Sequence, residues 1–88
     1  QAPADSLLAA IFAAEQARAS TTDQLAVLTQ ASRHADSLIQ RVAVRALGRL
    51  ERVELLSQIA PGLEAAAATV RIEAANAIAQ AAILAGAP

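Results

Sequence analysis

The residues best suited to binding chemistry are four arginines that follow one another at short intervals. Arg41, Arg45 and Arg49 recur every four residues and Arg52 lies just beyond them, so on a helix they form one basic ridge. A guanidinium group binds phosphate or carboxylate through two parallel hydrogen bonds. Three interpretations remain open: a solvated face with ion pairs to neighbouring helices, a patch for an acidic protein partner, or a nucleic-acid site.

Charge and composition weigh against the nucleic-acid interpretation. The formal net charge is -1 and the chain contains no lysine, whereas non-specific binding to nucleic acid depends on an excess of positive charge. Its one aromatic residue, Phe12, offers no set of rings for base stacking, and Glu51 and Glu54 neutralise part of the ridge. We therefore favour the ion-paired face and then the acidic protein partner. A nucleic-acid site would lose affinity steeply with salt and on replacement of Arg41 and Arg45 by glutamate.

Side chains for catalysis or metal binding are scarce. The chain has one histidine, His34, and no cysteine, lysine, tyrosine or tryptophan. We expect His34 in a surface turn at a helix end, where the partial negative charge favours a cation, rather than in a Ser-His-Asp arrangement. Glu51 and Glu54 lie three residues apart, but at a helix start they stabilise the positive end of the helix dipole. We expect no catalytic residue, cofactor or metal site in this segment.

The elements that position these residues follow from the composition. Alanine supplies 26 of the 88 residues, whereas Leu, Ile, Val and Phe together supply 23. Alanine is the best helix former, and small side chains let helices approach closely. These features predict a thin, all-α domain. No run of apolar residues is long enough to span a bilayer.

The apolar spacing predicts five helices, at about 5–19, 22–33, 37–50, 52–63 and 69–85. Thr21 followed by Gln24 is a capping-box pattern for the second helix, and Asp36 is a good N-cap for the third. Pro61-Gly62 should kink or shorten the fourth helix, because proline lacks an amide hydrogen. Such short connections between helices predict antiparallel hairpins. The predicted buried stripe of the third helix consists of Ile39, Val42, Ala43, Ala46, Leu47 and Leu50.

The helices repeat at an offset of 31 residues. This offset places apolar or small residues on one another in four helices, whereas the first helix fits it poorly and resembles a capping element. The aligned pairs are Leu25 with Leu56, Leu28 with Ile59, Ile39 with Val70, Ala43 with Ala74, Ala46 with Ala77, and Leu47 with Ile78.

These segments resemble the HEAT-like repeat family, in its short bacterial form. The resemblance covers about residues 21–85 and implies a short right-handed α-solenoid of stacked antiparallel hairpins that acts as a non-catalytic protein-interaction scaffold. On this basis 1–88 is one domain, with a capping helix at 1–20 and repeat helices at 21–50 and 52–85. The residues that carry the resemblance are Asp36, Ile39, Val42-Ala43, Ala46-Leu47-Gly48, Val70-Arg71 and Ala74-Ala75-Asn76-Ala77-Ile78.

Three residues receive structural roles from this alignment. The family commonly has an aspartate before a Val-Arg pair in each repeat, but here one repeat keeps Asp36 and the next keeps Arg71. We interpret them as a split pair that meets between repeats. Asn76 lies in a helix interior, where asparagine is unfavourable unless its amide is used, and we expect it to hydrogen-bond a neighbouring turn.

The last helix is apolar or small nearly all round, so it should be covered on more than one side. We expect Ile78, Ile83 and Leu84 to form a surface that is covered by a continuation of the chain or by self-association into a homo-oligomer. The partners that we expect are therefore proteins, including other domains of the same chain.

The segment is expected to be a fragment of a longer chain, since it contains no methionine. Its opening, Gln1-Ala2-Pro3-Ala4-Asp5, suits a mature exported protein and equally suits an arbitrary boundary, so the compartment stays open. The chain also resembles the HEAT-like segments that precede cyclophilin-type prolyl isomerase domains in some bacterial exported proteins. That resemblance implies an accessory arm of a larger enzyme, and no catalytic residue is carried over.

Overall fold

The computed structural model describes residues 3–83, and within this range every regular element is helical. The elements in chain order are α1 (Pro3–Gln16), α2 (Thr22–Ala31), α3 (Ser37–Arg49), the 3₁₀ helix η1 (Val53–Leu55), α4 (Leu56–Ile59), the 3₁₀ helix η2 (Ala60–Glu64) and α5 (Ala68–Ile83). The predicted all-α class with five α-helices is confirmed. None of these helices is long and apolar enough to cross a membrane.

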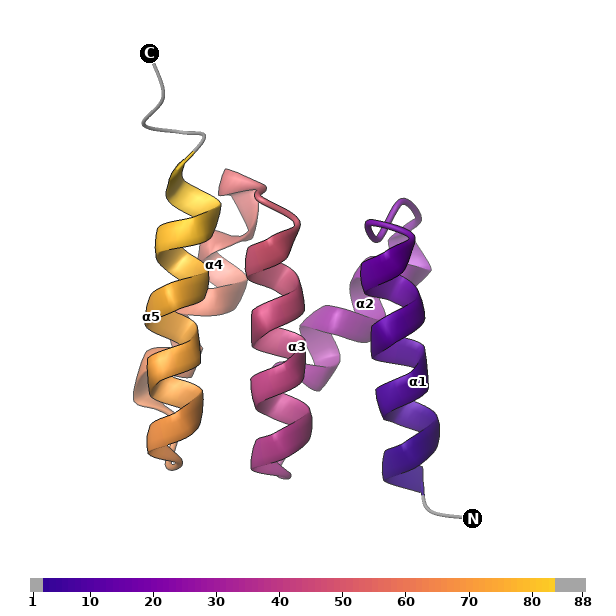
Figure 1. Cartoon of the computed structure of the whole chain (residues 1–88), viewed down its shortest axis with the longest axis horizontal. Helices are drawn as coiled ribbons and strands as arrows, with labels where there is room; N and C mark the ends of the chain where they lie inside the picture. Colours follow the sequence, from indigo (N-terminus) through magenta and orange to yellow (C-terminus); the bar gives the residue numbers. More distant parts are fainter. Residues whose placement is uncertain (1–2, 84–88) are drawn as a thin grey trace.

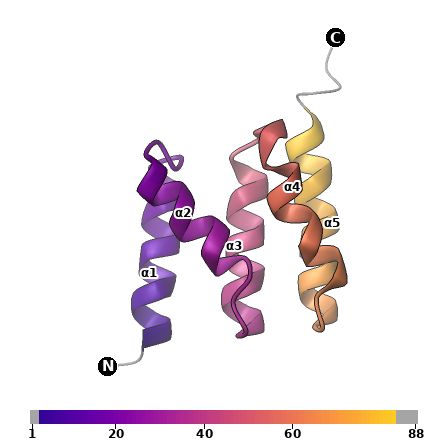
Figure 2. The ribbon, with the colours of Figure 1, turned by 180° about the vertical axis from the view of Figure 1, so that it is seen from behind.

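The helices form two rows. α1, α3 and α5 lie side by side and run in the same direction, as Figure 1 shows. α2 and the segment η1–α4–η2 run back in the second row, which faces the viewer in Figure 2. Consecutive elements are therefore antiparallel, and α3 in the middle of the first row packs against both α1 and α5.

Both predicted N-terminal caps are present. The Thr21 hydroxyl accepts a hydrogen bond from the Gln24 amide (3.1 Å), and the Gln24 side chain accepts one from the Thr21 amide (3.2 Å). Asp36 Oδ1 accepts hydrogen bonds from the amides of Leu38 (2.9 Å) and Ile39 (3.4 Å). These bonds satisfy amides that the first turn of a helix leaves without an internal partner.

The helix boundaries differ from the predicted ones where the backbone changes conformation. α1 ends at Gln16 rather than Ala19, because Arg18 and Ala19 adopt left-handed conformations with φ of 59° and 45°. The predicted effect of Pro61 is confirmed: α4 stops at Ile59, and the chain continues as the 3₁₀ helix η2.

The core follows the predicted stripe of α3 with one exchange. Five of the six predicted residues are buried, whereas Val42 is half-buried and Val44 is buried in its place. Gly48 is also buried, because it lies directly against Ala77 of α5. The core is thin, as expected from the alanine content, since α5 contributes Ala74, Ala77 and Ala81 to it.

Residues 31 positions apart have matching burial. In the first row the buried pairs are Ile39 with Val70, Ala43 with Ala74, Ala46 with Ala77, and Leu50 with Ala81. In the second row they are Leu28 with Ile59 and Ala31 with Gly62.

The first helix is displaced by two residues, which explains its poor fit at the 31-residue offset. Arg18 and Glu51, which are 33 residues apart, take the same left-handed conformation after α1 and α3, with φ of 59° and 55°. Arg18 precedes the N-cap Thr21 by three residues, whereas Glu51 precedes the N-cap Arg52 by one. At the offset of 33, Ile11 and Val44 are both buried. The longer connection after α1 thus shifts its register.

Candidate interaction surfaces

The arginine row on α3 is largely engaged with its neighbouring helices. Arg49 forms an ion pair with Glu15 of α1 at 3.0 Å, and Arg41 lies 4.0 Å from Glu73 of α5. The two outer arginines of α3 thus lean in opposite directions, one toward each neighbouring helix. Solvent reaches the arginine side chains, which are 37% exposed at Arg41 and 48% at Arg49, so each pair contributes little to stability.

Arg52 belongs to a second set of contacts, at the ends of α1 and α3. The Arg18 guanidinium donates to the carbonyl oxygens of Arg49 (3.0 Å) and Leu50 (3.3 Å). Arg52 Nη2 donates in return to the carbonyl oxygen of Arg18 (2.6 Å). A cation at the C-terminal end of a helix satisfies free carbonyl groups and the partial negative charge there. Arg18 and Arg52 therefore join the two helix ends.

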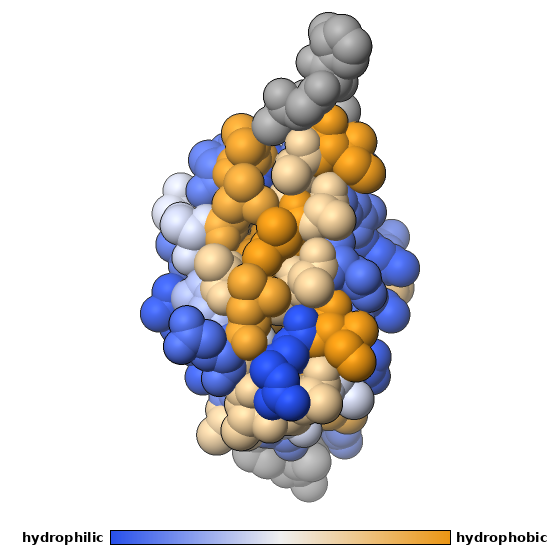
Figure 3. Space-filling model, turned by 90° about the vertical axis from the view of Figure 1, so that its left-hand side faces the viewer, coloured by the Kyte–Doolittle hydropathy of each residue, from blue (hydrophilic) through white to orange (hydrophobic). Residues whose placement is uncertain are grey.

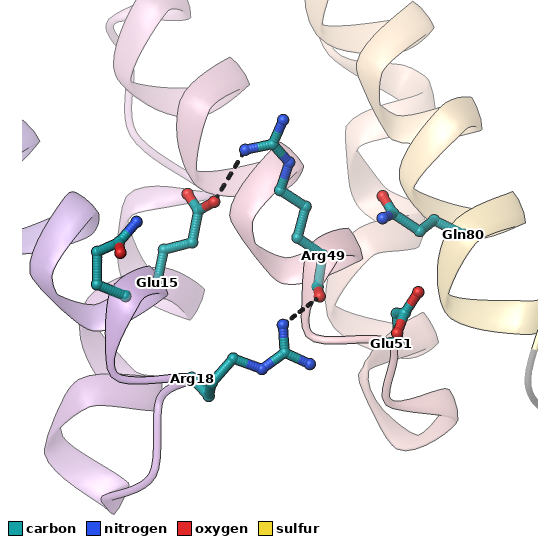
Figure 4. A pocket seen from close by; sticks show the side chains of 6 residues that line it. Glu15, Arg18, Arg49, Glu51 and Gln80 are labelled. Atoms are coloured by element: carbon teal, nitrogen blue, oxygen red, sulfur yellow. Dashed lines mark hydrogen bonds and ion pairs between the residues drawn. The ribbon is translucent and has the colours of Figure 1, made fainter.

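A polar hollow of about 460 Å³ opens beside these contacts, lined by Glu15, Gln16, Arg18, Arg49, Glu51 and Gln80. Figure 4 shows Arg49 directed at Glu15 and Arg18 directed at the carbonyl of Arg49. Both guanidinium groups are thus already paired, and helix C-termini add negative partial charge. The hollow has no cationic group left for a phosphate, which argues against a nucleic-acid or phosphate site there.

Arg45 is the exception in the arginine row. It is exposed, and it makes no ion pair or hydrogen bond within residues 3–83. Since Arg41 and Arg49 on either side of it are each paired with one glutamate, Arg45 carries the uncompensated positive charge of the α3 face. Of the four candidate arginines it is the one available to a partner.

The expected ion pair between Asp36 and Arg71 is not formed, and that prediction is wrong. Asp36 instead caps α3 through Leu38 and Ile39. The Arg71 guanidinium donates to the carbonyl oxygens of Ala65 (2.8 Å) and Ala66 (2.9 Å), in the turn before α5. Each side chain therefore stabilises the start of its own helix.

The structural hydrogen bond expected for Asn76 is also absent. Asn76 is exposed and makes no hydrogen bond to any residue in the described range. It lies at the position of α5 that corresponds to Arg45 of α3, as expected from the 31-residue offset. Both positions face solvent, so a polar side chain is tolerated there without a partner.

His34 lies in the connection between α2 and α3. Its Nδ1 accepts a hydrogen bond from the Asp36 amide (2.9 Å), so it helps to shape the turn that presents the Asp36 cap. It also borders an apolar hollow of about 200 Å³ between α1 and α2, with Leu7 and Val27. Among the described residues, no three His, Asp or Glu side chains lie together in a way that could hold a metal ion.

The outer face of α5 is an open apolar surface, which we call the α5 end face. Figure 3 shows apolar and small side chains running along this end of the molecule. Ile83 is 62% exposed, Ile78 is half-buried, and Leu84 lies outside the described residues. The structure adds four exposed residues that the sequence prediction did not include: Leu63, Ile72, Ala75 and Ala79.

The helical spacing could have identified most of these positions. Ile72, Ala75, Ala79 and Ile83 follow one another at intervals of three or four residues, which places them on one side of a helix. The opposite side carries the buried residues Val70, Ala74, Ala77 and Ala81. Leu63 lies on η2, and only the packing of η2 against α5 brings it to the same end.

Comparison with known proteins does not assign the chain to a family. It matches no protein-family model, and neither a curated protein nor a solved structure shows significant similarity to it. The functional argument therefore depends on the contacts within the chain.

Proposed function

We propose that this chain is part of a non-catalytic protein-interaction scaffold built from HEAT-like helical repeats, arranged as a short right-handed α-solenoid. The observation that carries the proposal is the α5 end face. Val44 and Gly48 of α3 are buried where η2 and α5 cover them, and the corresponding residues of α5, Ala75 and Ala79, are exposed. α5 thus presents the kind of face that α3 uses to receive a helical neighbour.

The small side chains on this face support close packing of a further helix. Alanine at both positions leaves room for a neighbouring backbone, and burial of the larger side chains Leu63, Ile72 and Ile83 would supply the hydrophobic driving force. A continuous exposed apolar surface of this kind is typical of interaction sites. We therefore place the stacking contact of the scaffold at the α5 end face.

A second contact of the scaffold is proposed on the solvent side of the first row. Arg45 has no partner within the described range, and Leu38, two turns earlier on α3, is 48% exposed. An unpaired arginine beside an apolar side chain suits a protein partner that offers a carboxylate. A nucleic-acid partner is disfavoured by the net charge of -1 and by the internal pairing of Arg41, Arg49 and Arg52.

An alternative is that the chain is the N-terminal accessory arm of a larger enzyme such as a cyclophilin-type prolyl isomerase. The same architecture would then hold the catalytic domain or present its substrate. The complete reading frame distinguishes the two proposals, because an isomerase domain in it would favour the arm.

A chain extended by one hairpin tests the proposal. A copy of residues 51–83 is joined after Ala81, the position that corresponds to Leu50, so that the natural turn at Glu51-Arg52 is preserved. If α5 receives a helical neighbour, the extended chain unfolds cooperatively, with a higher denaturant midpoint and a steeper transition than the 88-residue chain.

The matched control introduces Ala79→Arg into the extended chain, which places a charge at the new contact. It should abolish the gain, whereas the same substitution in the 88-residue chain should have little effect, because Ala79 is exposed there. An added hairpin that unfolds separately, or a gain that survives Ala79→Arg, would refute the proposed stacking.

A further inference from the structure

The two ends of the α1–α3–α5 row carry surfaces that fit each other. The α3–α5 contact is the template for this comparison. There Gly48 lies against Ala77, and Arg41 lies 4.0 Å from Glu73. The contact thus combines one close approach between small residues with one ion pair.

The α5 end face repeats the α3 side of this contact without its charge. At the offset of 31 residues, Gly48 corresponds to Ala79 and Arg41 corresponds to Ile72. Ala79 is exposed and Ile72 is 62% exposed. The small residue is therefore retained, and an apolar side chain stands in place of the arginine.

The free side of α1 repeats the α5 side of the contact, also without its charge. The offsets of 31 and 33 residues together make 64, so that Ala77 corresponds to Ala13 and Glu73 corresponds to Ala9. Both alanines are exposed on α1. The glutamate of the internal ion pair is thus absent at the end where its arginine partner is also absent.

These paired losses make the two ends complementary. If α1 of one molecule covers α5 of another, Ala13 meets Ala79 and Ala9 meets Ile72. No charge of the template contact is then left without its partner, which would otherwise cost several kcal/mol for a buried group. A random pair of surfaces would have no reason to lose both members of the ion pair together.

We infer that copies of this chain associate head to tail, with α1 of one copy packed parallel to α5 of the next. Ala13 takes the place at Ala79 that Ala77 takes at Gly48. A Cβ at Gly48 would lie 2.7 Å from the Cβ of Ala77, so the contact between two alanines is about 1 Å wider, within the 8–10 Å range of helix separations. Since the two surfaces differ, the contact is heterologous and extends into open chains of copies. This inference rests on the stacking of equivalent helices proposed above.

Cysteine cross-linking tests the arrangement, because the chain has no cysteine of its own. Ala13→Cys and Ala79→Cys are each made in separate 88-residue chains, and both positions are exposed. A disulfide needs Cβ atoms about 3.8 Å apart, which the wider contact provides. Under mild oxidation the mixture of the two variants should form disulfide dimers, and each variant alone should remain monomeric. A chain with both substitutions should form a ladder of oligomers.

The control for random collisions is Ser57→Cys, an exposed position on α4, mixed with Ala79→Cys. Its yield of dimer should be several-fold lower than that of the matched mixture. Equal yields, an absence of dimer in the matched mixture, or dimers formed by Ala79→Cys alone would overturn the inference. The last result would indicate a two-fold contact between α5 helices.

The outcome is separable from that of the proposed function. If the added hairpin stabilises the chain but the matched cysteines do not cross-link, helical stacking stands and head-to-tail association of copies is refuted. If the added hairpin gives no stability, the equivalence of the helix faces fails, and cross-linking at Ala13 and Ala79 should fail with it.

Discussion

Gly48 of α3 lies directly against Ala77 of α5, so that a Cβ added at Gly48 would lie 2.7 Å from both the Cα and the Cβ of Ala77. A real Cβ does not approach backbone atoms that closely, and one of the helices would have to move. The separation of α3 and α5 is therefore set by the absence of a side chain at Gly48.

Replacement of Gly48 by alanine should lower the free energy of unfolding. Overpacking of this kind costs about 1–3 kcal/mol, which exceeds the roughly 1 kcal/mol that alanine gains over glycine in helix propensity. Denaturant unfolding measures the difference. Arg45→Ala on the solvent side of α3 is the control and should change stability by less than about 0.5 kcal/mol. A more stable Gly48→Ala variant would contradict the close contact.

Replacement of Glu51 by glycine should stabilise the chain by roughly 1 kcal/mol, because a left-handed conformation is unfavourable for residues with a Cβ. Glu51 follows α3 with a φ of 55°, at a position where glycine is the preferred helix stop. The thermal midpoint should rise accordingly. Asn76→Gly in the interior of α5 is the matched control and should destabilise by about 0.5–1 kcal/mol. A loss of stability in Glu51→Gly would show that the side chain, rather than the backbone, determines this turn.

Removal of the Thr21 hydroxyl should cost about 1 kcal/mol, since the Gln24 amide loses its hydrogen-bond acceptor. Thr21→Ala and Thr22→Ala, compared by denaturant unfolding, separate the cap from helix propensity. Thr22 is the first residue of α2 and is exposed, so its replacement should be nearly neutral. Equal losses in the two variants would argue against the capping box.

Asp36 and Arg71 should behave independently in a double-mutant cycle. Asp36→Ala should cost about 1 kcal/mol through loss of the cap, and the coupling energy with Arg71→Ala should be below about 0.5 kcal/mol, as for separate sites. A larger favourable coupling would mean that the two side chains pair in solution, contrary to their contacts here.

Glu15 and Arg49 should couple, in contrast to that pair. Their 3.0 Å ion pair joins α1 to α3, and exposed pairs of this type contribute about 0.2–1 kcal/mol. The cycle of Glu15→Gln and Arg49→Gln should give a coupling energy in this range that falls at high salt, because mobile ions screen exposed charges. A coupling energy of zero at low salt would rule out a role for this pair in positioning α1.

Local features of this fold could be predicted from the sequence because each depends on a few adjacent residues. The caps at Thr21 and Asp36 and the shortened α4 before Pro61 are examples. The alanine-rich composition was sufficient for the all-α class. The 31-residue offset also identified which residues of α3 and α5 would be buried, since one helix period governs both.

Long-range features could not be predicted in the same way. The partners of Arg41 and Arg49 depend on which helix lies on each side of α3, and the spacing of residues on α3 alone does not contain that information. Asp36 and Arg71 were assigned to each other by alignment, but backbone groups within reach of each side chain compete more effectively for its hydrogen bonds. The register of α1 depended on the longer turn after Arg18, which hides its equivalence to α3.

The central claim is that α5 presents a face equivalent to the face of α3 that α5 itself covers. Amide hydrogen exchange of α5 in the 88-residue chain and in the hairpin-extended chain measures this most directly, because exchange reports the free energy of local opening. We predict that the α5 amides, including that of Ala79, exchange more slowly in the extended chain and that Ala79→Arg reverses the effect. Unchanged exchange rates along α5 in the extended chain would contradict the claim.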